Sequence, residues 1–307
     1  MDSKRRKKVA EELEAIFAAA GAGEAAQAPE TSAPARTNRL FEAASSLIRL
    51  RGGRKRDLAD PSTDGALVYA IGDVHGRYDL LKDLLTTIVH DYVARAKGRR
   101  PMLIFCGDYV DRGPDSAEVV EAVVWLKTNR RDIEVRALKG NHEQAMLAFI
   151  DSPSEGMDWL SYGGLDTLTS YGVRGSMDDE RNRRQSAKEL AAVLPPAHDE
   201  FLRNLELVIE AGDYAFVHAG IKHGRPLKKQ KEEHLLWIRE GFLDSDRHCG
   251  KLIVHGHTWV DELPQMRANR IGIDTGAYAT GVLTALRLDG TERKFLHARR
   301  RPEGLKR

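Results

Sequence analysis

Gly107-Asp108-Tyr109-Val110-Asp111-Arg112-Gly113 is the stretch that decides the fold of this chain. It directly follows the apolar run 102–106, which predicts a buried strand, and it precedes a helical pattern that begins near Asp115. We therefore expect Asp108 at the C-terminal tip of a strand, where open α/β sheets bind their ligands. The stretch alone is equally compatible with a capped turn, so its neighbours in the chain decide its meaning.

The same order of strand, polar motif and helix occurs before and after this stretch. A strand predicted over 67–71 ends at Gly72-Asp73-Val74-His75-Gly76, and a strand over 133–138 ends at Gly140-Asn141-His142-Glu143. The three motifs lie about 35 residues apart, in keeping with the roughly 30 or more residues of one βαβ unit. Right-handed crossovers bring the tips of parallel strands to one sheet edge, so the polar residues should converge.

The second half of the chain is β-rich and again places polar residues at strand ends. Strands are predicted over 205–210, 214–217, 252–254, 270–273, 282–288 and 293–297. His218-Ala219-Gly220 follows one of these strands and Gly256-His257-Thr258 follows another, while Leu288-Asp289-Gly290-Thr291 predicts a hairpin turn. The block between the halves, 151–210, has a mostly helical pattern, and we expect it to pack beside the sheet edge.

Composition and charge limit the classes of function. The chain has 307 residues and a net charge of +2, with basic and acidic residues interleaved, which does not indicate a nucleic-acid partner. Cys106 and Cys249 have no zinc-like or redox spacing, so we predict neither a disulfide framework nor a structural zinc site. No apolar run is long enough to span a membrane. We expect a cytoplasmic protein.

Residues 1–65 differ in composition from the rest of the chain. A charged helix is predicted over 7–20, and a basic amphipathic helix over 39–50. A helix of the latter kind can contact a protein or an acidic membrane surface, or dock on its own domain. We interpret 1–65 as a basic, partly disordered extension, 66–298 as the main domain with a helical insertion at 151–210, and 299–307 as a basic tail.

The polar residues at the strand ends form a set of oxygen and imidazole donors without cysteine. The set comprises Asp73, His75, Asp108, Asn141, His218 and His257. Such donors suit divalent Mn²⁺, Fe or Zn²⁺. This many ligands predicts two ions with Asp108 as a bridge, and two such ions can activate a water molecule and neutralise the oxygens of a phosphoryl group.

Three further polar residues fit phosphoryl chemistry. Arg112 can bind two phosphate oxygens at once. His142 lies next to the proposed ligand Asn141, so it can reach over the metals and protonate the leaving oxygen. Asp111 can hold that imidazole charged and oriented.

Taken together, the motifs at 72–76, 107–113 and 140–143 resemble the three signatures of the metallophosphoesterases, in the form used by the phosphoprotein phosphatase group of Ser/Thr phosphatases. The later motifs at 218–220 and 256–258 resemble that family's two further ligand motifs. The resemblance covers about residues 66–298. It implies an α/β fold in which two mixed β-sheets pack face to face with helices outside, a four-layer sandwich.

The resemblance also implies a role for individual residues. It places Asp73, His75 and Asp108 on the first metal ion, and Asp108, Asn141, His218 and His257 on the second. His142 with Asp111 is implied as the acid pair, and Arg112 as a phosphate clamp. Leu236-Trp237-Ile238-Arg239 resembles the segment that supplies a second clamp, which would be Arg239.

The expected function is that of a phosphomonoesterase with two divalent ions, Mn²⁺ first among them, that hydrolyses phosphoserine or phosphothreonine in proteins through a hydroxide bridging the ions. The alternatives are a hydrolase of small phosphoesters such as symmetrical dinucleoside tetraphosphates, and a phosphotyrosine phosphatase. Asp111 and Glu143 favour the protein-phosphatase branch over the dinucleotide hydrolases. A non-catalytic binding module would be expected to lack a ligand or the acid, and neither is missing.

Overall fold

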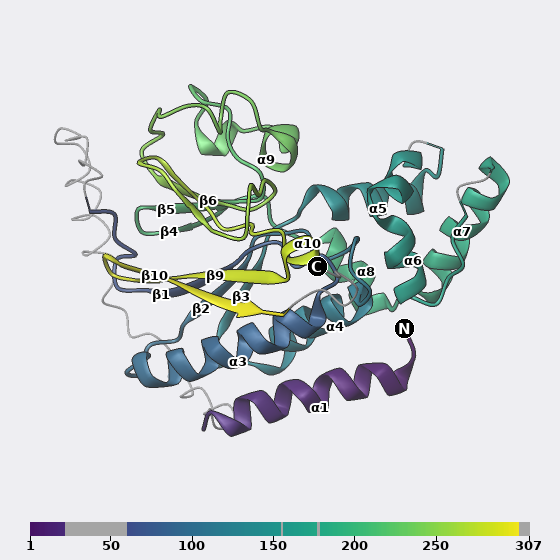
Figure 1. Cartoon of the computed structure of the whole chain (residues 1–307), viewed down its shortest axis with the longest axis horizontal. Coiled ribbons are helices and arrows are strands. Elements are labelled where there is room, and N and C mark those ends of the chain that lie inside the picture. Colours follow the sequence, from purple (N-terminus) through teal and green to yellow (C-terminus); the bar gives the residue numbers. More distant parts are fainter. Residues whose placement is uncertain (22–59, 155, 177–178, 301–307) are drawn as a thin grey trace, which may run out of the picture.

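The computed structural model of the chain describes residues 1–21, 60–154, 156–176 and 179–300. Two mixed β-sheets pack face to face, and helices cover their outer faces (Figure 1). This arrangement confirms the predicted four-layer α/β fold. The amphipathic helix predicted over 39–50 lies outside the described residues. Within the described part of the chain, no helix combines the length and the apolar character that crossing a membrane requires.

The first sheet has the strand order β10-β9-β1-β2-β3. Its strands are β1 (Leu67–Ile71), β2 (Met102–Phe105), β3 (Glu134–Ala137), β9 (Val282–Asp289) and β10 (Glu292–Arg299). The strands β1, β2 and β3 run parallel, and β9 joins β1 antiparallel. The predicted hairpin is confirmed, since β9 and β10 pair antiparallel around Gly290, whose φ is 61°.

The second sheet has the strand order β4-β5-β6-β8-β7. Its strands are β4 (Ile209–Ala211), β5 (Tyr214–Val217), β6 (Leu252–His255), β7 (Gln265–Met266) and β8 (Arg270–Gly272). The strand predicted over 205–210 is thus shorter and later than expected. The reason is that Glu206 forms a bridge with Leu138 beyond β3, so this part of the segment pairs with the first sheet instead.

Side chains that alternate between the two faces of each strand build the core between the layers. In β1, Val68 and Ala70 face the second sheet, where they meet residues such as Phe216 and Val254. The alternate residues of β1 face the helices on the other side. Both faces of β1 and of most of β2 are therefore buried, which explains why the sequences of these two strands are continuously apolar, whereas β3 is half-buried and contains Glu134 and Arg136.

Helices cover the first sheet and extend beyond its edge (Figure 1). They are α1 (Ser3–Ala19), α3 (Tyr78–Arg95), α4 (Ser116–Asn129), α5 (Asn141–Asp151), η1 (Met157–Tyr162), α6 (Gly164–Ser170), α7 (Glu180–Val193) and α8 (Pro196–Arg203). The second sheet carries η2 (Leu227–Lys229) and α9 (Glu232–Trp237), and α10 (Ala277–Thr280) precedes β9. Within the block predicted as mostly helical, η1 and α6 are divided at Gly163, whose φ is 108°.

Candidate metal centre and its acid pair

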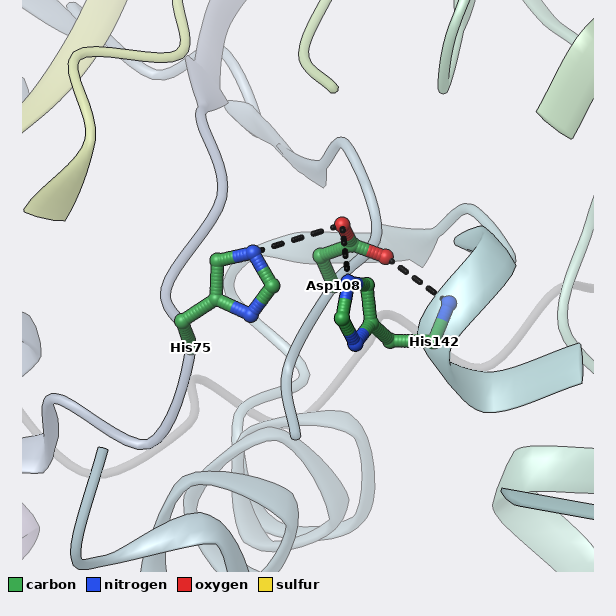
Figure 2. A group of neighbouring side chains, drawn as sticks. All are labelled: His75, Asp108 and His142. Carbon is green, nitrogen blue, oxygen red and sulfur yellow. Dashed lines mark hydrogen bonds and ion pairs between the residues drawn. The ribbon is translucent and has the colours of Figure 1, made fainter. Parts of the chain in front are cut away.

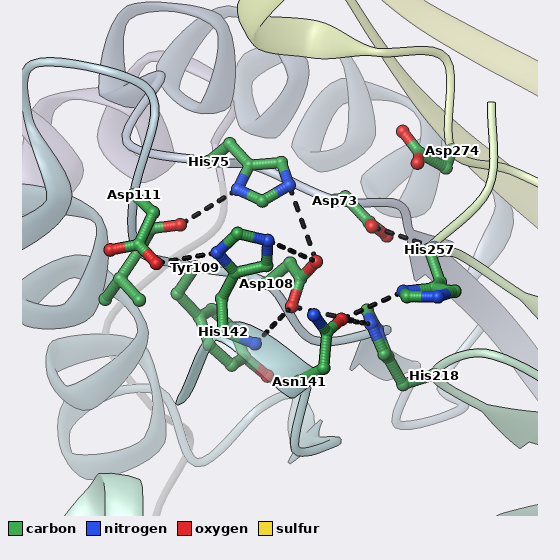
Figure 3. A network of polar contacts seen from close by, with 12 residues as sticks. Asp73, His75, Asp108, Tyr109, Asp111, Asn141, His142, His218, His257 and Asp274 are labelled. Atoms are coloured by element: carbon green, nitrogen blue, oxygen red, sulfur yellow. Dashed lines mark hydrogen bonds and ion pairs between the residues drawn. The ribbon is translucent and has the colours of Figure 1, made fainter. Parts of the chain in front are cut away.

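The ends of strands from both sheets meet at one place (Figure 3). Asp73 and His75 follow β1, Asp108 follows β2, His218 follows β5 and His257 follows β6, while Asn141 and His142 begin α5. Their side chains are almost fully buried. The structure therefore brings together all six residues that the sequence predicts as metal ligands.

Asp108 is the centre of the cluster. Nε2 of His75 lies 3.4 Å from one carboxylate oxygen of Asp108, and Nε2 of His218 lies 3.4 Å from the other. The backbone N–H of His142 donates to Asp108 Oδ1 over 3.2 Å (Figure 2). The two oxygens of one carboxylate thus face two different imidazoles, as a residue shared between two ions would.

Backbone carbonyls fix the tautomer of both imidazoles. Nδ1 of His75 donates to the Val110 carbonyl over 2.9 Å, and Nδ1 of His218 donates to the Cys106 carbonyl over 2.8 Å. Burial lowers the pKa of His75 to about 3 and lowers that of His218 as well. Each ring is therefore neutral and turns the lone pair of Nε2 toward Asp108, which is the form that binds a metal ion.

Asn141 and His257 complete the second side of the cluster. Oδ1 of Asn141 lies 2.8 Å from Nε2 of His218 and 2.9 Å from Nδ1 of His257. The backbone N–H of His257 donates to Asp73 Oδ2 over 2.8 Å. Gly256 allows this approach, because a Cβ at this position would lie 1.9 Å from Asp73 Oδ1.

The donor set fits two cations. Oδ1 of Asp73 and Nε2 of His257 are buried without a hydrogen-bond partner among the residues that the structure describes, and such atoms are costly unless a ligand satisfies them. Burial, together with the nearby carboxylates Asp274 and Asp108, raises the pKa of Asp73 well above its usual range. A cation would relieve this repulsion. Ligand atoms of Asp108, His218 and His257 lie within 4.8 Å of one another, and so do those of His75, Asp108 and His142.

The backbone is strained at the same residues. Positive φ angles occur at His75 (46°), Asp108 (51°), Asp111 (75°), Arg112 (67°) and His257 (65°). Residues other than glycine rarely adopt a positive φ, and each such backbone conformation costs about 1–3 kcal/mol of folding free energy. The fold thus maintains an unfavourable backbone in order to direct these five side chains.

His142 differs from the other imidazoles of the cluster. Its Nδ1 lies 2.6 Å from Oδ2 of the buried carboxylate Asp111, and its Nε2 points to Asp108 at 3.9 Å. Burial alone lowers the pKa of His142, but the charge of Asp108 and the hydrogen bond to Asp111 outweigh burial, so this pKa is raised. The pKa of His142 is thus raised where those of His75 and His218 are lowered, which suits an acid better than a metal ligand.

Three donors fix the carboxylate of Asp111. Besides His142, Trp159 Nε1 donates to Oδ2 over 2.8 Å and the Thr167 hydroxyl donates to Oδ1 over 2.6 Å. Both residues belong to the helical block at 151–210. The prediction that this block packs beside the sheet edge is consistent with these contacts.

The two predicted clamp residues lie at different places. Arg112 is half-buried beside the cluster, with its guanidinium carbon 4.7 Å from the centre of the Tyr278 ring. Arg239 is exposed just after α9, near enough to His257 for its charge to lower the pKa of that imidazole, after the larger effects of burial and His218. The structure therefore puts Arg112 beside the cluster and Arg239 at its rim.

Two further carboxylates were not predicted as site residues. Glu143 accepts four backbone N–H groups, from Asp108, Tyr109, Val110 and Gly140, at 2.8–3.3 Å. It holds the loop that carries Asp108. Asp274 follows β8, is buried near Asp73 (Figure 3), and accepts the Gly276 N–H over 2.9 Å. Its position after a predicted strand was the signal that could have identified it.

Comparisons with known proteins agree with this geometry. Residues 66–274 match the model of the calcineurin-like phosphoesterases. The chain is 28% identical over 236 residues to an asymmetrical bis(5'-nucleosyl)-tetraphosphatase of Anoxybacillus flavithermus, covering 71% of this chain and 88% of that protein. It is 29% identical over 225 residues to Serine/threonine-protein phosphatase 1 of Salmonella typhimurium, covering 72% and 91%.

Among solved structures, the fold is similar to that of a cold-active protein-tyrosine phosphatase from a Shewanella species. The TM-score is 0.50 at 20% identity, and the match covers 75% of this chain and 80% of that chain. At this level of identity the likeness concerns the fold alone. The family match begins at residue 66, so residues 1–65 precede it.

Proposed function

Because this chain belongs to the calcineurin-like phosphoesterase family and is therefore a hydrolase, we propose that it is a phosphatase that removes phosphate from serine and threonine side chains of proteins. The arrangement that carries the proposal is the His142–Asp111 pair beside Asp108, with Nδ1 of His142 2.6 Å from Asp111. A metal cluster with an adjacent protonated imidazole is suited to a substrate whose leaving oxygen needs a proton, as a serine alkoxide does.

The proposed metal ligands divide into two groups that share Asp108. Asp73, His75 and Asp108 would hold one ion, and Asp108, Asn141, His218 and His257 the other. Divalent ions in such a site, Mn²⁺ being our first choice, supply an activated water and neutralise charge on a phosphoryl group. The chain itself supplies lone pairs of fixed direction, since the tautomers of His75 and His218 are set by backbone carbonyls.

The remaining residues act on the substrate. We assign Arg112, half-buried beside the cluster, to binding two phosphate oxygens, and its stacking on Tyr278 limits the positions of the guanidinium. Arg239, at the rim, would add a second positive charge to the entrance. His142 would donate its proton to the leaving oxygen, while Asp111 stabilises the imidazolium until that transfer.

A second candidate function is the asymmetrical cleavage of dinucleoside tetraphosphates. The observation that favours it is the similarity to the Anoxybacillus protein of that name, which is as extensive as the similarity to the Salmonella protein phosphatase. The alternative that we expected from the sequence was the symmetrical cleavage. The two candidates share the same centre and differ only in what lies beyond the phosphate.

One assay distinguishes these candidates. The purified protein with Mn²⁺ would be given phosphoserine, phosphothreonine and phosphotyrosine peptides and, separately, diadenosine tetraphosphate, with the products separated by chromatography. We expect the highest kcat/KM for the phosphoserine and phosphothreonine peptides. Release of a nucleoside triphosphate and a monophosphate at a higher kcat/KM would favour the second candidate. His142→Asn protein, purified in the same way, controls for contaminating phosphatases.

A further inference from the structure

The N-terminal helix α1 is built into the helical layer of the main domain. Val9, Leu13 and Phe17 are fully buried against α3 and α4. The centre of the Phe17 ring lies 6.3 Å from that of Trp125 in α4, and the guanidinium carbon of Arg130 lies over the Phe17 ring, 3.7 Å from its centre. This helix precedes the family match at 66–274, so it is an addition to the shared domain.

Arg5 of α1 joins two elements that are separate in the chain. Its Nε donates to Glu118 of α4 over 2.7 Å, and its Nη1 donates to the carbonyl of Ser170 in α6 over 2.7 Å. The Ser170 hydroxyl in turn accepts the N–H of Ala117 in α4 over 2.8 Å. The beginning of α4 and the end of α6 are thus held together by Arg5 and Ser170.

These same two helices hold the carboxylate partner of His142. The hydroxyl of Ser116, the first residue of α4, accepts the N–H of Asp111 over 3.0 Å. The hydroxyl of Thr167 in α6 accepts the same N–H over 2.8 Å and donates to Asp111 Oδ1 over 2.6 Å. The position of Asp111 therefore depends on how α4 and α6 lie relative to each other.

We propose that α1 positions the acid pair, with Arg5 holding α4 and α6 together so that Ser116 and Thr167 fix Asp111 and, through it, His142. The inference rests on the proposed role of His142 as the acid. Arg5 contacts no reacting group and is a positioning residue. Its ion pair is half-exposed, with 36% of the Arg5 side chain accessible, and such pairs contribute little to stability. We therefore expect its loss to change geometry more than folding.

The test compares two substrates that differ in their need for an acid. The leaving group of a phosphoserine peptide is the serine oxygen, a basic alkoxide that needs the proton. The leaving group of nitrophenyl phosphate is nitrophenolate, a stable anion that hardly needs it. In the full chain, Arg5→Ala should lower kcat for the peptide about tenfold and kcat for nitrophenyl phosphate less than about twofold, since general acids contribute about 10²–10⁴ and only part is lost. The matched control is Lys7→Ala, because Lys7 is 77% exposed and forms an ion pair with Glu11 of the same helix.

The outcomes separate positioning from mere stabilisation. If Arg5→Ala lowered kcat for both substrates by the same factor, fewer molecules would be active and the proposal would be wrong. Wild-type kcat for both substrates would also overturn it. Leu13→Asp removes the apolar anchor of α1. In protein that circular dichroism shows to be folded, it should likewise lower kcat for the peptide more than kcat for nitrophenyl phosphate. If it does not fold, Arg5→Ala decides alone.

The test also distinguishes this proposal from the proposed function. His142→Asn must itself lower kcat for the peptide much more than kcat for nitrophenyl phosphate. If His142→Asn lowered kcat for both substrates by the same factor, His142 would not be the acid. The positioning proposal would then be wrong as well. A selective loss in His142→Asn without one in Arg5→Ala would overturn only the role of α1.

Discussion

Nδ1 of His142 lies 2.6 Å from Oδ2 of Asp111, on the side of the ring that faces away from the ligand cluster. The other nitrogen, Nε2, is thereby left to face Asp108 and the space above it. One carboxylate, Asp108, belongs to the centre of the proposed metal site, and the other, three residues later, holds an imidazole. Two acidic residues of one motif thus have two separate tasks.

Replacing His142 by Asn should remove the acid and leave the metal site in place. We expect kcat for a phosphoserine peptide to fall by about 10²–10⁴, with metal content by elemental analysis close to that of the wild type. His90→Asn is the matched control, since His90 is an exposed histidine of α3. Turnover at the wild-type rate in His142→Asn would remove His142 from the mechanism.

Replacing Asp108 by Asn should impair both metal sites together. Asn tolerates the left-handed backbone, here at φ 51°, so the change removes charge and an anionic oxygen without a new backbone conflict. We expect less than one ion per chain by elemental analysis after dialysis, where the wild type retains two. Asn141→Ala is the comparison, because Oδ1 of Asn141 lies next to His218 and His257 and its loss should weaken one site. Two ions at full occupancy in Asp108→Asn would contradict the bridge.

Much of this centre could be predicted from the sequence because its residues stand at strand ends. Apolar runs followed by Asp73, Asp108 and Asn141 at βαβ spacing indicate a common sheet edge, and the structure brings these residues together. The second sheet followed mainly from the family resemblance, since its strands are short. In β7, for example, only two residues pair, which is too few for any periodicity to be read.

The residues that support the centre could not be predicted, because their partners are distant in the chain. Thr167 lies 56 residues after Asp111, and Arg5 lies 113 residues before Glu118. Nothing in local periodicity indicates such pairs. Likewise, the helix at the N-terminus was predictable as a helix, but its burial against α3 and α4 depends on the tertiary fold. The contact partners of α1 are therefore a finding of the structure alone.

Glu143→Gln should loosen the loop that carries Asp108. The carboxylate accepts four N–H groups, and an amide has only one oxygen for them, so at least one pair of buried donors loses its partner. We expect the free energy of unfolding to fall by about 2–6 kcal/mol, at about 1–3 kcal/mol for each of the two unsatisfied groups. Urea denaturation measures this change. Glu14→Gln, an exposed position of α1, is the control and should lie within about 0.5 kcal/mol of the wild type. An unchanged midpoint for Glu143→Gln would mean that the loop does not depend on these bonds.

His255 should make the metal-free protein less stable as pH falls. Its Nδ1 donates to the Gly256 carbonyl over 2.9 Å, and its Nε2 lies 3.3 Å from the guanidinium of Arg270, which is compatible only with the neutral ring. Burial lowers the pKa of His255 from 6.5 to about 3. Between these two values the unfolded chain binds a proton that the folded chain does not, so acidification favours unfolding, by up to ~1.4 kcal/mol per pH unit.

The variant His255→Gln isolates this effect, because an amide does not titrate. With a chelator present, the free energy of unfolding from urea titrations between pH 6 and pH 4 should fall less steeply for His255→Gln than for the wild type, by up to ~1.4 kcal/mol per pH unit. His90→Gln, at the exposed histidine of α3, should retain the wild-type slope. Equal slopes for His255→Gln and the wild type would show that the folded protein accepts the proton on His255 at an ordinary pKa, in conflict with the buried neutral ring.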